Sequence, residues 1–238
     1  MKKKTLKTIC IICARGGSKG IKNKNLQLVD GKPLISYPIT AAKKSSIIDN
    51  IIVSTDSKKI ASCAKNYGAE IPFLRPKKYS DDLTTTEETL QYSLLKYEEI
   101  KKFKFDICVF LTATDIFRKV SWIRSAVKIL KSNSNIESVF CGHKTHKNFW
   151  EYRNNNWVRL KSWMKNYSSR QIRQHIVRED TGIACASRAN LWRKGKRIGN
   201  KVKIIENDNF FTSIDIHEPS DLKLANFAMK IWKKNIYN

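Results

Sequence analysis

The stretch TICIICARGGSKGIKNKNL, residues 8–26, decides the fold. It begins as an apolar run of strand length and then changes into glycines followed by cations. A buried strand that ends in such a turn is typical of the first unit of a parallel α/β sheet. Glycines let the backbone approach a ligand closely, and free N–H groups in the turn can bind phosphate oxygens. The sequence therefore predicts an anion cradle directly after the first strand.

The cradle differs from the two common nucleotide-binding motifs, because neither G-x-x-x-x-G-K-[ST] nor G-x-G-x-x-G fits it. Four cations surround the turn, namely Arg15, Lys19, Lys22 and Lys24. Together they could neutralise a triphosphate. Judged by the residues alone, an ordinary strand-to-loop turn with solvated lysines remains the alternative.

Apolar runs and amphipathic segments alternate along the whole chain, which predicts an α/β fold with βαβ units around a mainly parallel sheet. Strands are expected at 8–14, 50–56, 106–113, 136–142, 181–187, 201–206 and 211–216, with a short extended stretch at 70–76. Helices are expected at 34–45, 57–68, 84–102, 119–132 and 220–234. Gly68 is expected to close the second helix, and a threonine among 84–86 to cap the third.

Composition limits the functional class. The 238 residues suffice for one α/β domain, and the formal net charge is +25. That charge would fit a nucleic-acid binder, but lysines are spread through loops and helix faces everywhere, so a substrate with several negative charges explains the local clusters better. The six cysteines lie mostly in apolar runs and read as small buried residues. No run is long enough to span a bilayer, and we expect a soluble cytoplasmic protein without a nucleic-acid or membrane partner.

Between about residues 143 and 178 the pattern becomes aromatic, basic and asparagine-rich, without a clear period. This section could be a hairpin excursion that packs against a second subunit, with Trp150, Trp157 and Trp163 as apolar anchors. Composition alone equally allows an irregular lobe that covers the protein's own core.

Several motifs resemble those of one enzyme family, in the family's order. ARGGSKGIKNKNL is similar to the signature A-R-x-G-S-K-G-[IL]-x-x-K-N of the CMP-sialic acid synthetases, a family of cytidylyltransferases that includes enzymes for legionaminic, pseudaminic and related ulosonic acids. Further similar segments are IIVSTDSKKIASCAKNYGAEIPFLRP, SDDLTTTEETL, SSRQIRQHIVREDTGIA and SIDIHEPSDLKLA. The resemblance covers nearly the whole chain.

The resemblance implies a three-layer, Rossmann-like nucleotide-sugar transferase domain with a small dimerisation excursion, and therefore a homodimer. It also implies the reaction of CTP with an ulosonic acid, assisted by Mg²⁺, to give a CMP-sugar and pyrophosphate. Catalytic roles would fall to Arg15, Lys24 and Asp215. The nucleotide would be bound by Ala14, Arg15, Gly16, Gly17, Ser18, Lys19, Asn25, Arg75 and Thr86. The acceptor sugar would meet Thr112, Arg170, Gln171 and Arg178, partly across the dimer interface, because arginine matches a carboxylate bidentately.

Two departures from the family pattern concern the metal. Asp215, expected at the end of a buried strand, is implied as a Mg²⁺ ligand, but His217 stands where the family has a second aspartate. In LTATDIFR, where the family usually reads L-Q-P-T-S-P-L-R, Asp115 appears in place of a serine. Related enzymes for the eight-carbon acid of lipopolysaccharide carry an aspartate in this loop, so Asp115 and Asp215 are hypothesised to share the metal. The alternative for Asp115 is a helix cap.

Two other functions remain open on the sequence. A nucleotidyltransferase that acts on a sugar phosphate would share the cradle, but it would lack the closing SIDI and the Arg-Gln pair. A basic binding protein that has lost catalysis would be consistent with His217, Thr112 and Ala113, but not with an intact cradle. The altered loops lie on the acceptor side, so the identity of the ulosonic acid is open.

Overall fold

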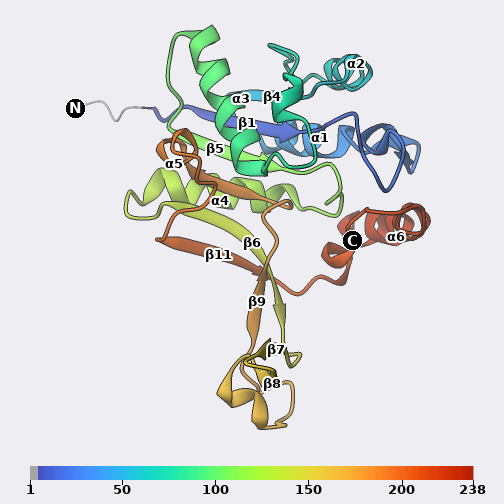
Figure 1. Ribbon diagram of the computed structural model, residues 1–238, viewed down its shortest axis with the longest axis vertical. Coiled ribbons are helices and arrows are strands. Elements are labelled where there is room, and N and C mark those ends of the chain that lie inside the picture. Colours follow the sequence, from blue (N-terminus) through green and yellow to red (C-terminus); the bar gives the residue numbers. More distant parts are fainter. Residues whose placement is uncertain (1–4, 238) are drawn as a thin grey trace.

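Strand β1 (Thr8–Cys13) lies inside the central sheet, as its uniformly apolar sequence predicts (Figure 1). The computed structural model describes residues 5–237, and within them this sheet has seven strands. Their order is β11-β6-β10-β5-β1-β4, and β9 pairs with β6. The other strands are β4 (Asn50–Ser54), β5 (Ile107–Leu111), β6 (Ser138–Thr145), β9 (Ile176–Glu179), β10 (Cys185–Arg188) and β11 (Val202–Asn207).

The sheet is mainly parallel, as predicted, with one correction. Strand β1 pairs in parallel with β4 and β5, and β11 pairs in parallel with β6. Strand β10, expected to be parallel at 181–187, is antiparallel to both β5 and β6. The reason is its connection: β6 and β9 form an antiparallel pair, and the chain passes from β9 straight into β10 without a crossover helix. An apolar run does not reveal strand direction, so the sequence could not show this.

The expected strand at 211–216 is also wrong. Phe210–Ser213 is a 3₁₀ helix, and the segment that follows it has no regular structure up to α6. The Asn209 side chain accepts a hydrogen bond from the N–H of Phe211, an arrangement that competes with strand formation. Ile214 and Ile216 are buried, which produces a strand-like alternation in the sequence. The extended stretch at 70–76 contributes only a single bridge, between Ile52 and Glu70.

Helices cover both faces of the sheet and make three layers, which confirms the predicted fold class (Figure 1). Side chains that alternate along β1 separate two cores: Cys10 and Ile12 face one, and Ile9 and Ile11 face the other. The first core contains α1 (Ser36–Ser45), α2 (Lys58–Asn66), α4 (Val120–Ser132) and α6 (Pro219–Tyr237). The second contains α3 (Thr86–Lys101) and the short α5 (Ala189–Arg193). None of the helices within residues 5–237 has the length and apolarity needed to cross a bilayer.

Helix ends follow the predicted signals. Thr85 caps α3 in a capping box with Glu88. Gly68 follows the last residues of α2 with φ of +89°, a conformation that strongly favours glycine. Smaller elements near the site are the hairpin β2 (Leu28–Val29) and β3 (Lys32–Pro33), and the 3₁₀ helices Lys24–Leu26 and Lys77–Tyr79.

Four cysteines behave as the sequence predicts: Cys10, Cys108, Cys141 and Cys185 are buried as free thiols. Burial raises the pKa of each of them, to about 12 for Cys141 and Cys185. Cys13 and Cys63 are only partly buried. The four buried thiols are therefore protonated at neutral pH and act as packing residues.

Residues 146–175, here called the arm, lie between β6 and β9 and extend away from the body (Figure 1). The arm holds the hairpin β7 (Trp150–Arg153) and β8 (Asn156–Arg159), and a 3₁₀ helix, Ser162–Lys165. It is shorter than the predicted 143–178, because β6 and β9 continue the sheet into both ends of that range. Trp157 is 62% exposed and Ile172 is 77% exposed.

Candidate active site

The strand order creates a crevice beside β1. The chain leaves β1 for β4 on one side and then crosses back to β5 on the other, so the connections after β1 and β5 diverge. A cavity of about 440 Å³ lies there, at the carboxyl ends of both strands. Six of the predicted site residues line it: Arg15, Ser18, Lys19, Lys24, Asn25 and Thr112. No aspartate or glutamate belongs to this lining, so the cavity offers cations and polar groups to an anion.

The glycine-rich loop supplies free donors. The N–H groups of Gly17, Lys19 and Gly20 make no hydrogen bond within the described part of the chain. The N–H of Gly16 is different, because it donates to Asp56 Oδ1 at 2.8 Å. Gly20 lies so close to the carbonyl oxygen of His217 that a Cβ would collide with it. The loop therefore presents three unpaired donors, whereas the N–H of Gly16 is already used.

Asn25 fixes the shape of the loop. Its side chain is buried, and Nδ2 donates to the carbonyl oxygen of Arg15 at 3.0 Å. Its own carbonyl oxygen accepts a hydrogen bond from the N–H of Ile35. Asn25 therefore closes the loop on itself and holds Arg15 at the cavity wall.

Two cradle cations share a carboxylate that the sequence did not single out. Asp82 accepts from Arg15 Nη1 at 2.7 Å and from Lys19 Nζ at 2.8 Å. Hydrogen bonds from Lys19 and Arg15 hold the pKa of Asp82 below its usual range. The segment SDDLTTTEETL resembles the family, but nothing in one sequence indicates which of its acids turns towards the glycine-rich loop. In this structure Asp82 supplies to Arg15 and Lys19 the negative charge that a bound phosphate would supply.

Lys24 ties the cradle to the closing segment. Its Nζ donates to the carbonyl oxygen of Ile216 at 3.1 Å. Burial lowers the pKa of Lys24, and the nearby Asp215 carboxylate partly opposes that change. The fold thus brings Lys24 and Ile216 together, although they lie near opposite ends of the chain.

Asp215 follows the 3₁₀ helix rather than a strand, and it lies beside the cavity. Its Oδ2 is 2.7 Å from Nε2 of His217, one of the residues that line the cavity. The backbone N–H groups of His217 and Glu218 both donate to Asp221, which fixes the segment at the start of α6. The conformation of this closing segment is therefore fixed by hydrogen bonds and not by strand pairing.

Asp115 is the second acid of the site. It accepts a hydrogen bond from the Thr112 hydroxyl and is held close to Gly182, where any Cβ would collide with its carboxylate. Burial raises the pKa of Asp115, and the charges of Asp215 and Asp180 raise it further. The alternative role as a helix cap is wrong, because α4 begins after Lys119 and has no side-chain cap.

The carboxylates of Asp115 and Asp215 are suitable Mg²⁺ ligands, but they do not form a complete coordination shell. Within residues 5–237 no group of three or more His, Cys, Asp or Glu side chains is arranged to hold a metal ion. Mg²⁺ keeps several waters and is commonly bound by one or two carboxylates together with substrate phosphates. Asp115 and Asp215 repel each other electrostatically, and a cation between them would relieve that repulsion.

Comparison with known proteins agrees with this geometry. The sequence model of the family described as Cytidylyltransferase matches residues 9–195. This chain belongs to the cytidylyltransferase family. It is 32% identical over 243 aligned positions to a CMP-N,N'-diacetyllegionaminic acid synthase of Legionella pneumophila, which covers 95% of this chain and 97% of that protein. It is 31% identical to post-translational flagellin modification protein B of Campylobacter coli, with 96% of both chains covered.

Solved structures show the same fold at low sequence identity. CMP:2-keto-3-deoxy-manno-octonic acid synthetase complexed with CTP superposes with a TM-score of 0.67 at 14% identity, over 94% of this chain and 98% of that chain. The 4-diphosphocytidyl-2C-methyl-D-erythritol synthase of Anaerococcus prevotii gives a TM-score of 0.64, over 94% and 99%. These structures confirm the fold class.

Five predicted nucleotide residues of this cytidylyltransferase lie outside the cavity lining: Gly16 and Gly17 of the glycine-rich loop, and Ala14, Arg75 and Thr86. Ala14 is buried and donates to the carbonyl oxygen of Ser54, so it extends the pairing of β1 with β4. Arg75 is also buried, with Nη1 on the Ser54 carbonyl oxygen at 3.2 Å. Thr86 is the first residue of α3. Arg75 therefore supports the end of β4 in this structure.

The predicted acceptor residues are divided between two places. Thr112 lines the cavity beside β1. Arg178, on β9, forms an ion pair with Asp180 at 2.7 Å and also interacts electrostatically with Asp115 and Asp215. Arg170 and Gln171 lie on the arm instead, where they line a separate cavity of about 260 Å³. The cytidylyltransferase brings only part of this set together within one chain.

One structural arginine of the site was missed altogether. Arg118 is buried, and it donates through Nε to the Ile183 carbonyl oxygen at 2.7 Å and through Nη2 to the Thr112 and Gly182 carbonyl oxygens at 2.9 and 2.7 Å. It thereby fastens the loop after β5 to the segment before β10. Its place at the end of LTATDIFR was visible in the sequence, but its burial was not.

Proposed function

We propose that this cytidylyltransferase couples CTP to a nonulosonic or related ulosonic acid to give a CMP-sugar and pyrophosphate. The cavity at the carboxyl ends of β1 and β5 carries the proposal, because it gathers Arg15, Lys19 and Lys24 with unpaired backbone donors and no acidic lining residue. The family match and the likeness to a synthetase complexed with CTP support it. A triphosphate is the ligand whose charge this arrangement matches best.

The reaction is a substitution at the α-phosphorus of CTP. The anomeric hydroxyl oxygen of the acid forms the new bond to phosphorus, the bond to the bridging oxygen of the β-phosphate breaks, and the hydroxyl proton passes to solvent. Pyrophosphate leaves with the bonding electrons and gains negative charge. Arg15 and Lys24 would stabilise that charge from the cradle, and the backbone N–H groups of Gly17 and Gly20 would orient the phosphates.

The Mg²⁺ requirement is also part of the proposal. Asp115 and Asp215 would hold the ion, which would supply charge neutralisation of the phosphates. Replacing Asp115 by Asn should then reduce activity most strongly when Mg²⁺ is limiting, and partly recover with excess Mg²⁺. An Asp115→Asn protein with full activity at limiting Mg²⁺ would remove Asp115 from the ligand set.

The names of the relatives narrow the choice of acceptor sugar to be tested. Two relatives that align over 94–95% of this chain are named CMP-N,N'-diacetyllegionaminic acid synthases, from Legionella pneumophila and Campylobacter jejuni. Relatives named for pseudaminic acid and N-acylneuraminate align over only 54–59% of it. A legionaminic-type nonulosonic acid is therefore the first acceptor to test.

We further propose that the enzyme works as a homodimer in which the arm of one chain completes the site of the other. Trp150 and Trp157 on the arm are 48% and 62% exposed, and they would be covered in such a dimer. The arm also carries Arg170 and Gln171, which lie apart from the cavity of their own chain.

The deciding experiment measures pyrophosphate release with Mg²⁺ from each nucleoside triphosphate, across a panel of ulosonic acids and sugar phosphates. The proposal predicts release from CTP with a nonulosonic acid and little from the other pairs. Release only with a sugar phosphate would favour the other nucleotidyltransferase function. Absence of release with any pair would favour a binding protein without catalysis.

A further inference from the structure

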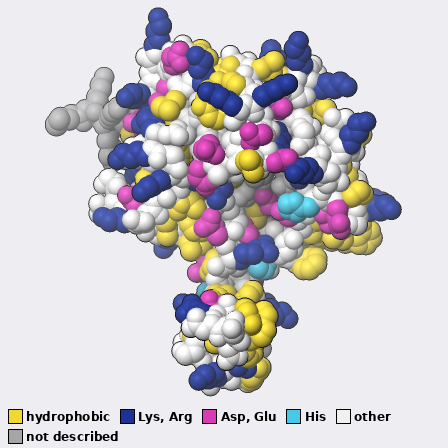
Figure 2. All heavy atoms as spheres, in the orientation of Figure 1, with side chains coloured by type: hydrophobic (Ala, Val, Ile, Leu, Met, Phe, Trp, Pro, Cys, Tyr) yellow, Lys and Arg dark blue, Asp and Glu magenta, His cyan; other side chains and the backbone are white. Residues whose placement is uncertain are grey.

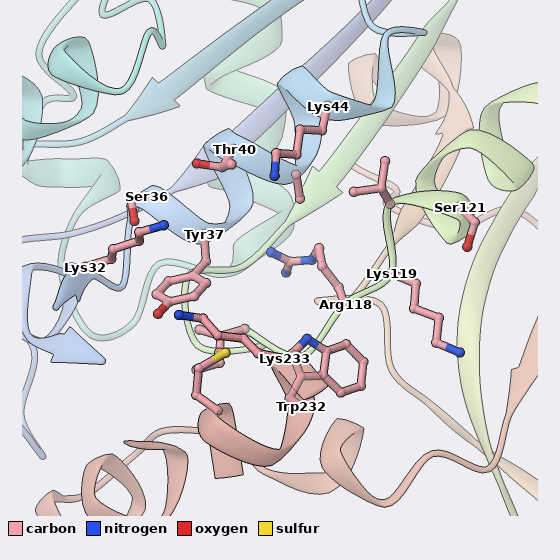
Figure 3. A pocket seen from close by; sticks show the side chains of 14 residues that line it. Lys32, Ser36, Tyr37, Thr40, Lys44, Arg118, Lys119, Ser121, Trp232 and Lys233 are labelled. Carbon is pink, nitrogen blue, oxygen red and sulfur yellow. The ribbon is translucent and has the colours of Figure 1, made fainter. Parts of the chain in front are cut away.

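A second cavity of about 530 Å³ opens between α1, α6 and the start of α4 (Figure 3). It shares no lining residue with the cavity beside β1. Five cations line it, and no aspartate or glutamate belongs to the lining. These cations are Lys32, Lys44, Arg118, Lys119 and Lys233. The whole chain is rich in lysine, and cations are spread over the face shown in Figure 2. A cavity lined by positive charges alone nevertheless requires an explanation.

Arg118 distinguishes this cavity from a surface lysine patch. Its side chain is only 6% exposed, and its Nε and Nη2 are saturated by three carbonyl oxygens. Its Nη1 has no hydrogen-bond partner among the described residues. In Figure 3 the guanidinium points into the space between Tyr37 and Lys44. A buried guanidinium nitrogen without an acceptor is costly, and an anion in the cavity would supply one.

The positive end of a helix meets the same space. Val120 and Ser121, the first two residues of α4, belong to the lining. The helix has no side-chain cap at Lys119 and no acid in its first turn, so nothing on the helix itself compensates its N-terminal dipole. Helix N-termini with free N–H groups favour phosphate groups.

Most of the lysines are free to complete a site. Within residues 5–237, Lys32, Lys44 and Lys119 form no ion pair, and Lys119 only approaches the Trp122 ring. Lys233 is the exception, because it pairs with Asp30. One wall is apolar and aromatic, formed by Trp232 of α6 together with Tyr37 of α1 (Figure 3).

We propose that this cavity is a second anion site, separate from the nucleotide cavity, which binds the phosphoryl group of a small molecule. Arg118 and the α4 N-terminus form its floor, and Lys32 and Lys44 form its rim. The ligand is either inorganic phosphate or a phosphorylated organic molecule whose apolar part lies on the Trp232 wall. This inference does not depend on the acceptor or on catalysis.

Calorimetry with inorganic phosphate, pyrophosphate and phenyl phosphate tests the proposal. The Arg15→Gln/Lys24→Gln protein removes the competing phosphate contacts of the nucleotide cavity. In this background one binding event per chain is expected to persist. Adding Lys32→Gln and Lys44→Gln should weaken it at least about tenfold, since each lost charged hydrogen bond is a large part of so small a ligand's affinity. The matched control adds Lys65→Gln and Lys128→Gln, which remove two exposed lysines elsewhere on the body.

The outcomes are distinct. Tighter binding of phenyl phosphate than of inorganic phosphate would identify an organic phosphate as the ligand, and equal or weaker binding would identify inorganic phosphate. No binding in the Arg15→Gln/Lys24→Gln background would overturn the proposal. An equal loss in the Lys65→Gln/Lys128→Gln control would also overturn it, because the effect would then come from net charge alone. Circular dichroism of each variant confirms that the fold is kept.

Discussion

The cavity beside β1 and the arm are held by the chain in opposite ways. The loop after β1 is tied to remote segments, through Arg15 to Asp82 and through Lys24 to the Ile216 carbonyl oxygen. The arm is held mainly by contacts within itself, such as that of Arg159 with Tyr167. It exposes aromatic side chains that a folded body would normally cover. In the proposed function, one chain builds the CTP half of the site, and the arm would complete the acceptor half of a partner chain.

The largest expected effect concerns the cavity side of this comparison. Replacing Asp215 by Asn should lower kcat by roughly hundredfold, because a proposed metal ligand that also balances Lys24 is neutralised. Steady-state pyrophosphate release at saturating Mg²⁺ measures it. Glu99→Gln, an exposed acid on α3, is the control and should keep normal activity. Equal activity of the two variants would show that the closing motif is only structural.

Mixing two inactive proteins tests whether the arm acts on another chain. Arg170→Ala disables the arm, and Lys24→Gln disables the cavity. Random mixed dimers should recover about a quarter of normal activity, because half of the dimers contain one intact site of two. If each chain used its own arm, the mixture would remain as inactive as its components. Activity is measured after the two proteins have exchanged subunits.

Asp82 gives a smaller effect of opposite sign. Asp82→Asn should tighten CTP binding by a few fold, since a phosphate would no longer compete with this carboxylate for Arg15 and Lys19. Equilibrium binding of CTP without acceptor measures the change, again with Glu99→Gln as control. Weaker binding in Asp82→Asn would mean that the carboxylate orients the cations for the nucleotide instead of competing with it.

The smallest expected effect is on stability. The pKa of Asp115 is raised in the folded protein, so the folded state binds this proton more tightly than the unfolded state does. The free energy of unfolding therefore falls as the pH rises from the unfolded pKa to the folded pKa. Asp115→Asn should therefore raise the melting temperature by a few degrees at pH 7 and change it little at pH 3. Glu151→Gln on the arm hairpin should raise it at neither pH. A lower melting temperature for Asp115→Asn at pH 7 would show that the buried carboxylate is net stabilising.

The sequence predicted the cavity better than its surroundings, for physical reasons. The loop after β1 is contiguous, so its glycines and cations could be interpreted together, and six predicted residues do line one cavity. Asp82 and Arg118 could not be found in this way, because their roles depend on contacts between segments distant in sequence. The strand errors have a similar origin. The direction of β10 depends on the arm's return path, and the false strand around Asp215 reflects buried residues in an irregular segment.

The most direct test of the account is the affinity of the chain for CTP, measured by calorimetry with Mg²⁺ before any acceptor is added. The wild-type protein should bind CTP, and Arg15→Gln/Lys24→Gln should bind it at least about a hundredfold more weakly, as expected for the loss of two charged contacts. The Lys65→Gln/Lys128→Gln control should retain the wild-type affinity. Unchanged CTP affinity in Arg15→Gln/Lys24→Gln would contradict the claim that the turn after β1 holds the nucleotide.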